Sequence, residues 1–210
     1  MKKVLASLLL LCICLTALTA CRSGGEPAVK LGEPITAETW QAWIAPDAHP
    51  CDNFTSTFTL MYGSTVMREE IVRCAGNECI VTTRQGENEF TMGYFLIDGV
   101  LGSYEYDPEA KKWSKMSIDL VYKSTASPLK CYPHPLEEMT YDEETGGYSY
   151  EKRLDAVGED DTELELEAYF QQGNLVFLRI RDTVTESYSE WRGSDFGTTV
   201  VKRPDASEIK

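Results

Sequence analysis

Alternation of hydrophobic and polar residues dominates the chain after residue 52 and predicts β-strands. In residues 53–61 the aromatic and leucine side chains occupy even positions and threonines occupy odd positions, so the two kinds face opposite sides of a strand. Residues 163–172 alternate in the same way, with Leu164, Leu166, Ala168 and Phe170 on one face. This period of two residues is that of a strand with one buried face.

Turn residues divide the rest of the chain into short segments of the same kind. Further strands are expected at residues 65–74, 79–84, 89–97, 100–106, 111–118, 138–141, 148–154, 175–183 and 187–192. Asp98-Gly99 and Gly173-Asn174 are typical of tight hairpin turns. Short hairpins make neighbouring strands antiparallel, so about ten strands predict one large antiparallel sheet, twisted and partly curled.

One helix is expected before the strands. Thr36 is a suitable N-cap, and Trp40, Trp43 and Ile44 fall on one helical face before Pro46 ends the helix. Residues 119–135 contain three prolines and predict a loop with one helical turn. The fold class is therefore mainly β with minor α, a large curled antiparallel sheet with an N-terminal helix and a proline-rich covering segment. These two segments are small for the concave face, which suggests a cavity.

The first 21 residues have the pattern of a bacterial lipoprotein signal. Lys2 and Lys3 precede an apolar run at residues 4–15 that is too short for a membrane-spanning helix. Leu18-Thr19-Ala20-Cys21 resembles the lipobox, which implies a diacylglyceryl group on Cys21 and cleavage before it. We therefore expect an exported protein anchored to the outer face of the bacterial cell membrane; the alternative is a plain signal peptide with a chance cysteine.

The remaining chain divides into a tether and one domain. Residues 1–20 are the signal peptide, residues 21–34 a lipidated flexible tether, residues 35–204 a single β domain and residues 205–210 a tail. The formal charge is −14, and the loss of Lys2 and Lys3 makes the mature chain more negative. Such a surface repels nucleic acid and anionic lipid heads, so the lipid anchor must hold the domain at the membrane. We expect a monomer.

Two passages resemble the LolA/LppX-like bacterial lipoproteins. The first lies in Glu89–Lys115 and contains Tyr94-Phe95-Leu96-Ile97-Asp98-Gly99, Tyr104-Glu105-Tyr106-Asp107 and Lys112-Trp113-Ser114-Lys115. The second is Ser194-Asp195-Phe196-Gly197-Thr198-Thr199 with Pro204. The resemblance implies a half-barrel sheet wrapped over helices, with an apolar cavity that takes acyl chains or glycolipid. The family usually has more helix between the sheet halves and usually lacks the four internal cysteines.

Those four cysteines predict two disulfides in an exported domain. Cys74 and Cys79 bracket a four-residue turn and are expected to face each other across a hairpin. That pairing leaves Cys51 with Cys131, and closing so long a loop contributes about 4 kcal/mol in the chain-entropy model. Three connectivities are possible from the sequence alone.

The only two histidines each lie near one of these cysteines, which raises a second possibility. His49, Cys51, Cys131 and His134 form a tetrahedral zinc site if their segments meet. The spacing is tighter than that of usual structural zinc sites and export favours oxidation, so a disulfide with solvated histidines is the better hypothesis. We expect no cofactor.

Acidic residues gather at 137–138, 142–144 and 159–161, and Glu163, Glu165 and Glu167 share one strand face. These glutamates either form a solvated sheet face, bind calcium weakly or meet a basic partner. The sequence has no Ser-His-Asp order, phosphate loop or HExxH motif, and both histidines are flanked by or close to prolines. We therefore expect no enzymatic activity.

The expected function is binding of an acyl chain or another apolar ligand in the concave face of the sheet. Candidates for the cavity lining are Trp40, Trp43, Phe54, Phe58, Tyr94, Tyr104, Leu166, Phe170 and Leu178. The alternative for these side chains is an ordinary core. The alternative function is an interaction or sensing module of the cell envelope that has no small ligand.

Overall fold

The computed structural model describes residues 30–45, 51–117, 128–131, 134–154, 162–182 and 185–210. Leu31–Lys210 forms a compact unit. None of the helices in these ranges is long and apolar enough to cross a membrane.

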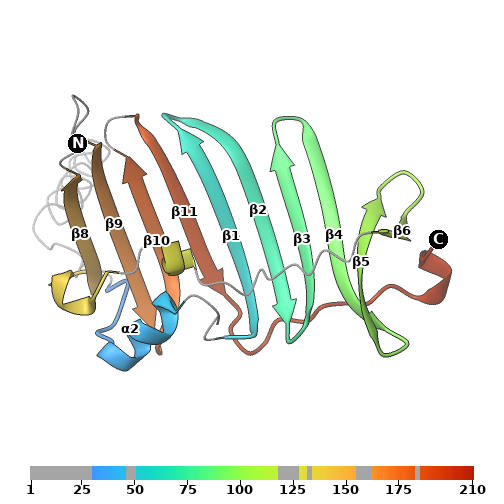
Figure 1. The fold of residues 1–210 in the computed structure, drawn as a ribbon, viewed down its shortest axis with the longest axis horizontal. Coiled ribbons are helices and arrows are strands. Elements are labelled where there is room, and N and C mark those ends of the chain that lie inside the picture. The colour runs from blue at the N-terminus through green and yellow to red at the C-terminus, as the bar shows by residue number, and fades with distance from the viewer. Residues whose placement is uncertain (1–29, 46–50, 118–127, 132–133, 155–161, 183–184) are drawn as a thin grey trace, which may run out of the picture. The chain divides into compact units, whose positions relative to one another are not determined.

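The described residues form a sheet of eleven strands with one α-helix beside it (Figure 1). The strands are β1 (Asn53–Tyr62), β2 (Thr65–Ala75), β3 (Glu78–Gln85), β4 (Asn88–Ile97), β5 (Val100–Asp107), β6 (Lys112–Lys115), β7 (Thr140–Asp142), β8 (Gly147–Leu154), β9 (Thr162–Gln171), β10 (Asn174–Asp182) and β11 (Ser187–Ser194). The helices are α2 (Ala37–Ile44) and the short 3-10 turns η1 (Pro128–Cys131), η2 (Leu136–Glu138) and η3 (Ala206–Glu208).

The sheet consists of two meanders, which are joined where the first strand of the chain pairs with the last. Its order is β6-β5-β4-β3-β2-β1-β11-β10-β9-β8-β7, and every pairing is antiparallel (Figure 1). Each strand follows its neighbour in the chain except at the centre, where β1 pairs with β11. The prediction of one large, unclosed antiparallel sheet with minor helix is confirmed, with eleven strands where about ten were expected.

Tight turns connect the strands as their residues require. Asp98 and Gly99 both have positive φ, 52° and 78°, as a two-residue turn of the primed type needs. The turn between β9 and β10 is one residue earlier than predicted. Gln172 and Gly173 hold the positive φ values, 51° and 77°, because Asn174 already pairs with Gln171 in the ladder.

Helix α2 begins and packs as its sequence predicts. The side chain of Thr36 accepts a hydrogen bond from the Thr39 backbone N at 3.1 Å, which caps the first turn. Trp40 and Trp43 are fully buried against a cluster built from β8, β9, β10 and β11. Leu129 of η1, in the proline-rich segment, is buried in the same cluster; residues 118–127 and 132–133 lie outside the described residues. The helix therefore covers only one half of the sheet.

The other half has a cluster on each face. Phe54, Val72, Cys74, Cys79, Val81 and Tyr94 lie on the face that bears α2. Phe95, Tyr104 and Trp113 lie on the opposite face of β4, β5 and β6, where Val201 and Ile209 of the C-terminal segment pack against them. The sheet is thus covered by different segments on its two faces.

Both chain ends of the domain are bound to the sheet. Leu31 N donates to Thr145 O at 2.8 Å and Glu33 N donates to Phe170 O at 2.7 Å, so the end of the predicted tether is already part of the domain. At the other end, Ile209 forms a parallel bridge with Trp113, and Lys210 N donates to Trp113 O at 2.8 Å. The segment set apart as a tail therefore covers the outer edge of β6.

Candidate functional site

Five of the predicted cavity residues meet in the packed cluster under α2. Trp40, Trp43, Leu166, Phe170 and Leu178 are all buried there. The Trp43 ring lies 6.3 Å from the ring of Phe170, and its Nε1 donates to Gly173 O at 3.0 Å. Trp40 Nε1 likewise donates to His134 O at 2.7 Å. Both indoles are held by hydrogen bonds as well as packing, so the helix fills this half of the face.

The other four candidates are divided between the two faces. Phe54 and Tyr94 belong to the second cluster on the α2-bearing face, and Phe58 is half-buried at the border between the two clusters. Tyr104 lies on the opposite face, so its assignment to the same cavity is wrong. The register explains this, because Tyr94 pairs with Ser103 and the next residue of a strand points the other way.

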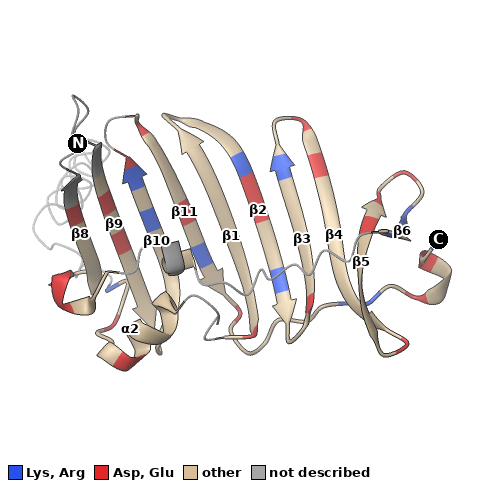
Figure 2. Cartoon of the chain, viewed as in Figure 1, with Lys and Arg blue, Asp and Glu red and all other residues tan. Residues whose placement is uncertain are grey.

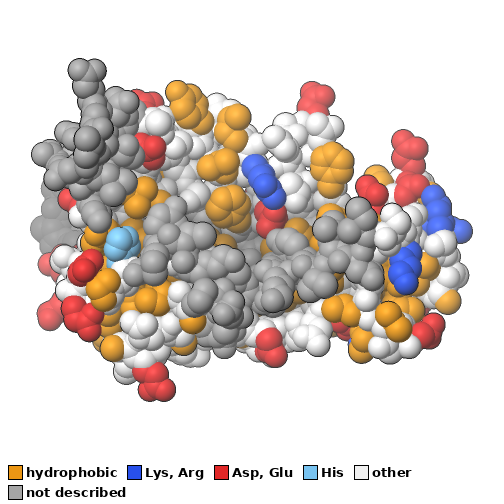
Figure 3. Space-filling view, in the orientation of Figure 1, with side chains coloured by type: hydrophobic (Ala, Val, Ile, Leu, Met, Phe, Trp, Pro, Cys, Tyr) orange, Lys and Arg blue, Asp and Glu red, His pale blue; other side chains and the backbone are white. Residues whose placement is uncertain are grey.

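A partly exposed group of apolar side chains remains on the α2-bearing face, beyond the helix. We define the apolar strip as Phe58, Leu60 and Tyr62 on β1 together with Phe90 and Met92 on β4. Leu60, Tyr62 and Phe90 keep 38%, 61% and 55% of their surface exposed. Figure 3 shows hydrophobic side chains exposed on this face of the molecule, away from the helix. Exposed apolar side chains in such a group mark a binding surface more often than scattered ones do.

An ion pair separates the two sides of the apolar strip. Arg68 lies directly opposite Leu60, and Glu70 lies opposite Phe58 on one side and Thr83 on the other. Arg68 Nη2 and Glu70 Oε2 are 2.6 Å apart. Figure 2 shows basic and acidic positions next to each other along β2. Among the described residues, Arg68 and Glu70 are the charged side chains that β1–β4 place on this face.

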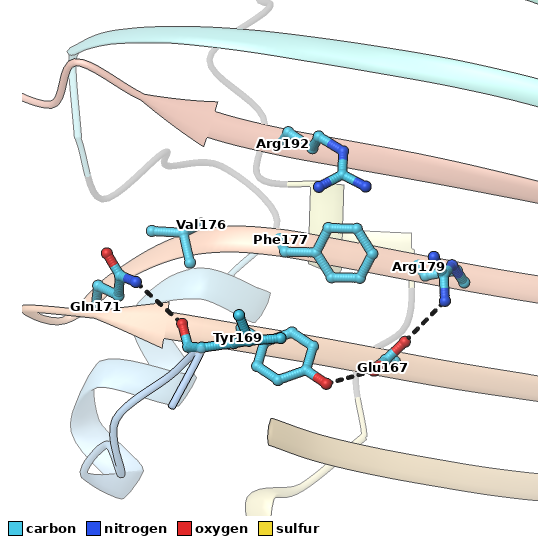
Figure 4. A pocket seen from close by; sticks show the side chains of 8 residues that line it. Glu167, Tyr169, Gln171, Val176, Phe177, Arg179 and Arg192 are labelled. Atoms are coloured by element: carbon cyan, nitrogen blue, oxygen red, sulfur yellow. Dashed lines mark hydrogen bonds and ion pairs between the residues drawn. The ribbon is translucent and has the colours of Figure 1, made fainter. Parts of the chain in front are cut away.

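A pocket of about 390 Å³ lies on the opposite face of β9, β10 and β11 (Figure 4). Its floor is the aromatic pair Tyr169 and Phe177, whose ring centres are 5.7 Å apart. A bulge between Leu175 and Phe177 brings Phe177 opposite Tyr169. Burial and the hydrogen bond to Glu167 raise the pKa of Tyr169. Arg192 lies over the Phe177 ring, with its Cζ 4.6 Å from the ring centre.

The charges in this pocket compensate one another. Arg179 lies between Glu167, at 3.2 Å, and Glu190, at 2.6 Å, and Arg192 binds Glu190 at 2.8 Å. Burial raises the pKa of Glu190, but the hydrogen bonds from the two arginines together lower it by more. The pKa of Glu190 therefore lies below the usual value. Because each arginine already has a carboxylate, the pocket offers little net charge to a ligand.

The same arrangement recurs on the other half of this face. Arg84 lies between Glu69, at 2.9 Å, and Glu89, at 2.7 Å, and the cross-strand register places both groups of three in one row across the sheet. Thr59 of β1 separates them, opposite Glu190 and Glu69. The row therefore links neighbouring strands through opposite charges, as expected for a solvated sheet face.

Of the predicted acidic face, Glu167 belongs to this row and Glu165 lies beside it on the same face. Glu165 and Glu167 face away from α2, and their basic partners are Arg181, at 3.6 Å, and Arg179 of the neighbouring strand. The side chain of Glu163 and residues 159–161 lie outside the described residues. The sequence did not reveal these partners, because the pairing of β9 with β10 brings them together.

The disulfide prediction is confirmed for one pair. Cys74 and Cys79 are bonded and lie directly opposite each other in β2 and β3. Cys51 Sγ donates to Asn53 O at 3.0 Å. The side chain of Cys131 lies outside the described residues, as does Cys21, so the second disulfide and the lipidation stay predictions.

The alternative zinc site does not fit the positions of two of its ligands. The His134 ring stacks on Tyr150 of β8, with ring centres 4.2 Å apart, whereas Cys51 lies just before β1. β1 and β8 are four positions apart in the sheet, which is roughly 19 Å at the usual strand spacing. Zinc ligands lie about 2.0–2.3 Å from the ion, so these two side chains do not share one. His49 lies outside the described residues, in which no cluster of three metal-binding side chains occurs.

Comparison with known proteins leaves the fold and the site as the basis for function. No model of a protein family matches this chain, and no curated protein matches it. The resemblance to LolA/LppX-like lipoproteins therefore stays a prediction from two short passages.

Proposed function

We propose that the mature protein is a non-enzymatic lipoprotein of the cell envelope that binds an acyl chain on the α2-bearing face of β1–β4. The observation that supports this proposal is the apolar strip, which is partly exposed on the half of the sheet that α2 does not cover. The strip continues below into the buried second cluster through Met92, which packs against it. An apolar chain laid on the strip would cover side chains that now meet water.

The binding would come from burial of apolar area. An acyl chain on the strip that buries about 600 Å² of apolar surface, counted on the chain and the protein together, gains roughly 15 kcal/mol before the costs of association. Those costs leave an affinity in the micromolar range, about −8 kcal/mol at best, if the chain fills the strip on both β1 and β4. The polar groups around the strip would then orient the ligand without supplying most of the affinity.

The predicted lipoprotein signal would hold this surface beside a source of acyl chains. Residues 22–30 connect Cys21 to the domain and span at most about 30 Å when fully extended. An acidic domain is repelled by anionic lipid heads, so the lipidated cysteine would keep it at the membrane. The tether and the strip would thus act together.

The test uses residues 22–210, which contain the whole compact unit and lack the lipidated cysteine. Native mass spectrometry should detect co-purified lipid, and a fluorescent fatty acid should bind and be displaced by unlabelled fatty acid. Leu60→Gln and Phe90→Gln should weaken binding at least fivefold, because each puts an amide on the strip. Val200→Gln is the matched control, since Val200 is an exposed apolar residue outside the strip.

The proposal fails if the unmutated protein binds no lipid and the strip variants behave like the control. If the strip variants instead lose one defined envelope protein in pull-down experiments, the interaction module replaces the lipid carrier as the explanation of the same surface.

A further inference from the structure

We infer that Arg68 selects acyl lipids with an anionic head, a phosphate or a carboxylate, on the apolar strip. This inference rests on the proposed function, which concerns only the acyl chain. It adds the chemical class of the head and the residue that recognises it.

Arg68 lies on β2, between the β1 and β4 parts of the apolar strip. Its direct cross-strand neighbour is Leu60. Phe90 lies two strands away and level with Glu70, which places Phe90 roughly 12 Å from Arg68 at the usual strand spacing and rise. The guanidinium is therefore located between the two apolar sides of the strip. A lipid whose chains lie on β1 and β4 brings its head to this point.

Within the described part of the chain, Arg68 has fewer carboxylate partners than Arg84 and Arg179. Arg84 and Arg179 each lie between two glutamates on the opposite face, so carboxylates surround their guanidinium groups. Among the residues that the structure describes, Arg68 has one ion pair, in which its Nη2 meets Glu70. The Arg68 side chain keeps 47% of its surface exposed, whereas Glu70 keeps 16%. Arginine has five N–H donors, so donors remain for the oxygens of an anionic head.

Glu70 has a positioning role in this arrangement. It is half-buried between Phe58 and Thr83 and fixes one end of the guanidinium. Glu70 also balances the charge of Arg68. Because Arg68 is the more exposed member of this ion pair, the pair favours a small anion over a second cation. The head and its acyl chains would then be recognised by different parts of one surface.

The experiment uses the full chain in its membrane and photoactivatable lipids with identical acyl chains. The probes are phosphatidic acid, free fatty acid and neutral diacylglycerol, and peptide mass spectrometry locates the cross-links. We expect labelling in residues 58–62 and 90–92, with the anionic probes about five- to tenfold above diacylglycerol. Arg68→Gln should bring the three probes to about equal yield, and Arg68→Lys should keep part of the preference.

Arg73→Gln is the matched control, because this substitution removes the same charge from the same strand. Arg73 points to the opposite face of the sheet. A preference for one anionic probe alone identifies the head as phosphate or as carboxylate and supports the inference. Equal labelling by all probes in the unmutated chain, or an equal loss in Arg73→Gln, overturns the inference and leaves the proposed function standing. Absence of cross-links from the strip with every probe overturns both.

Discussion

Phe58 of β1 lies directly opposite Trp191 of β11, in the one pairing that joins the two meanders of the sheet. Trp191 is buried beneath α2, with its ring 6.3 Å from that of Trp43, whereas Phe58 is only half-buried. The covered half of the sheet therefore ends at this pair, and the apolar strip begins there. Stability and the proposed binding surface can be tested separately on its two sides.

On the covered side, Trp43→Phe should destabilise the fold. Phenylalanine keeps an aromatic ring near Phe170 and Trp191 but loses the donor that binds Gly173 O. We expect a fall of about 1–3 kcal/mol in the free energy of unfolding, measured with urea, because a carbonyl loses its partner and a smaller ring leaves space. Leu60→Ala, on the exposed side, should cost less; an equal or larger loss there would contradict this division.

Gly93→Ala should also destabilise the sheet, at the other end. A methyl group at residue 93 would meet the ring of Phe95 and lie 2.8 Å from the Trp113 ring. The glycine thus leaves space for the rings of the cluster formed by Phe95, Tyr104 and Trp113. Overpacking there costs about 1–3 kcal/mol. Gly102→Ala on β5 is the comparison, because its nearest neighbour is the Tyr104 ring at 3.1 Å. Thermal unfolding of both variants should give the lower midpoint for Gly93→Ala.

Glu190 should make stability depend on acid. Its pKa is below the usual 4.5, so the unfolded chain takes up a proton at this residue before the folded protein does. The stabilisation that ionised Glu190 provides is complete above the usual pKa of 4.5, and it is lost as the pH falls through the lower pKa of the folded protein.

Glu190→Gln should therefore lower the free energy of unfolding by about 1 kcal/mol at neutral pH and by less below pH ~4. Denaturant unfolding from pH 3 to pH 7 measures this difference. Glu87→Gln, in the exposed turn between β3 and β4, serves as the control. A difference from the unmutated protein that stays constant with pH would show that Glu190 acts only through packing.

The Cys74–Cys79 disulfide should stabilise the domain by about 2 kcal/mol, since the closed loop is short. The Cys74→Ser, Cys79→Ser double variant should lose that much free energy of unfolding and therefore unfold at a lower urea concentration. Peptide mapping without reduction should find this pair in the unmutated protein, and it also tests the predicted bond between Cys51 and Cys131. A Cys74 peptide joined to any other cysteine would contradict the structure.

The sequence by itself determined the local elements of this protein. Alternation of side chains placed the strands, because a strand with one buried face needs a period of two. Thr36 and Pro46 placed the helix, and Asp98-Gly99 placed a hairpin turn, because these residues have few other backbone choices. Cys74 and Cys79 followed from the same hairpin logic.

Only the tertiary structure decided which local elements meet. The pairing of β1 with β11 joins residues far apart in the chain, and no local pattern encodes it. That pairing joins the two groups of ion pairs into one row, and it brings the half of the sheet under α2 beside the half that bears the apolar strip. The face of Tyr104 also depended on the exact register, because a shift of one residue reverses every side chain of a strand. Long-range contacts carry this information, and they form only when the whole sheet is assembled.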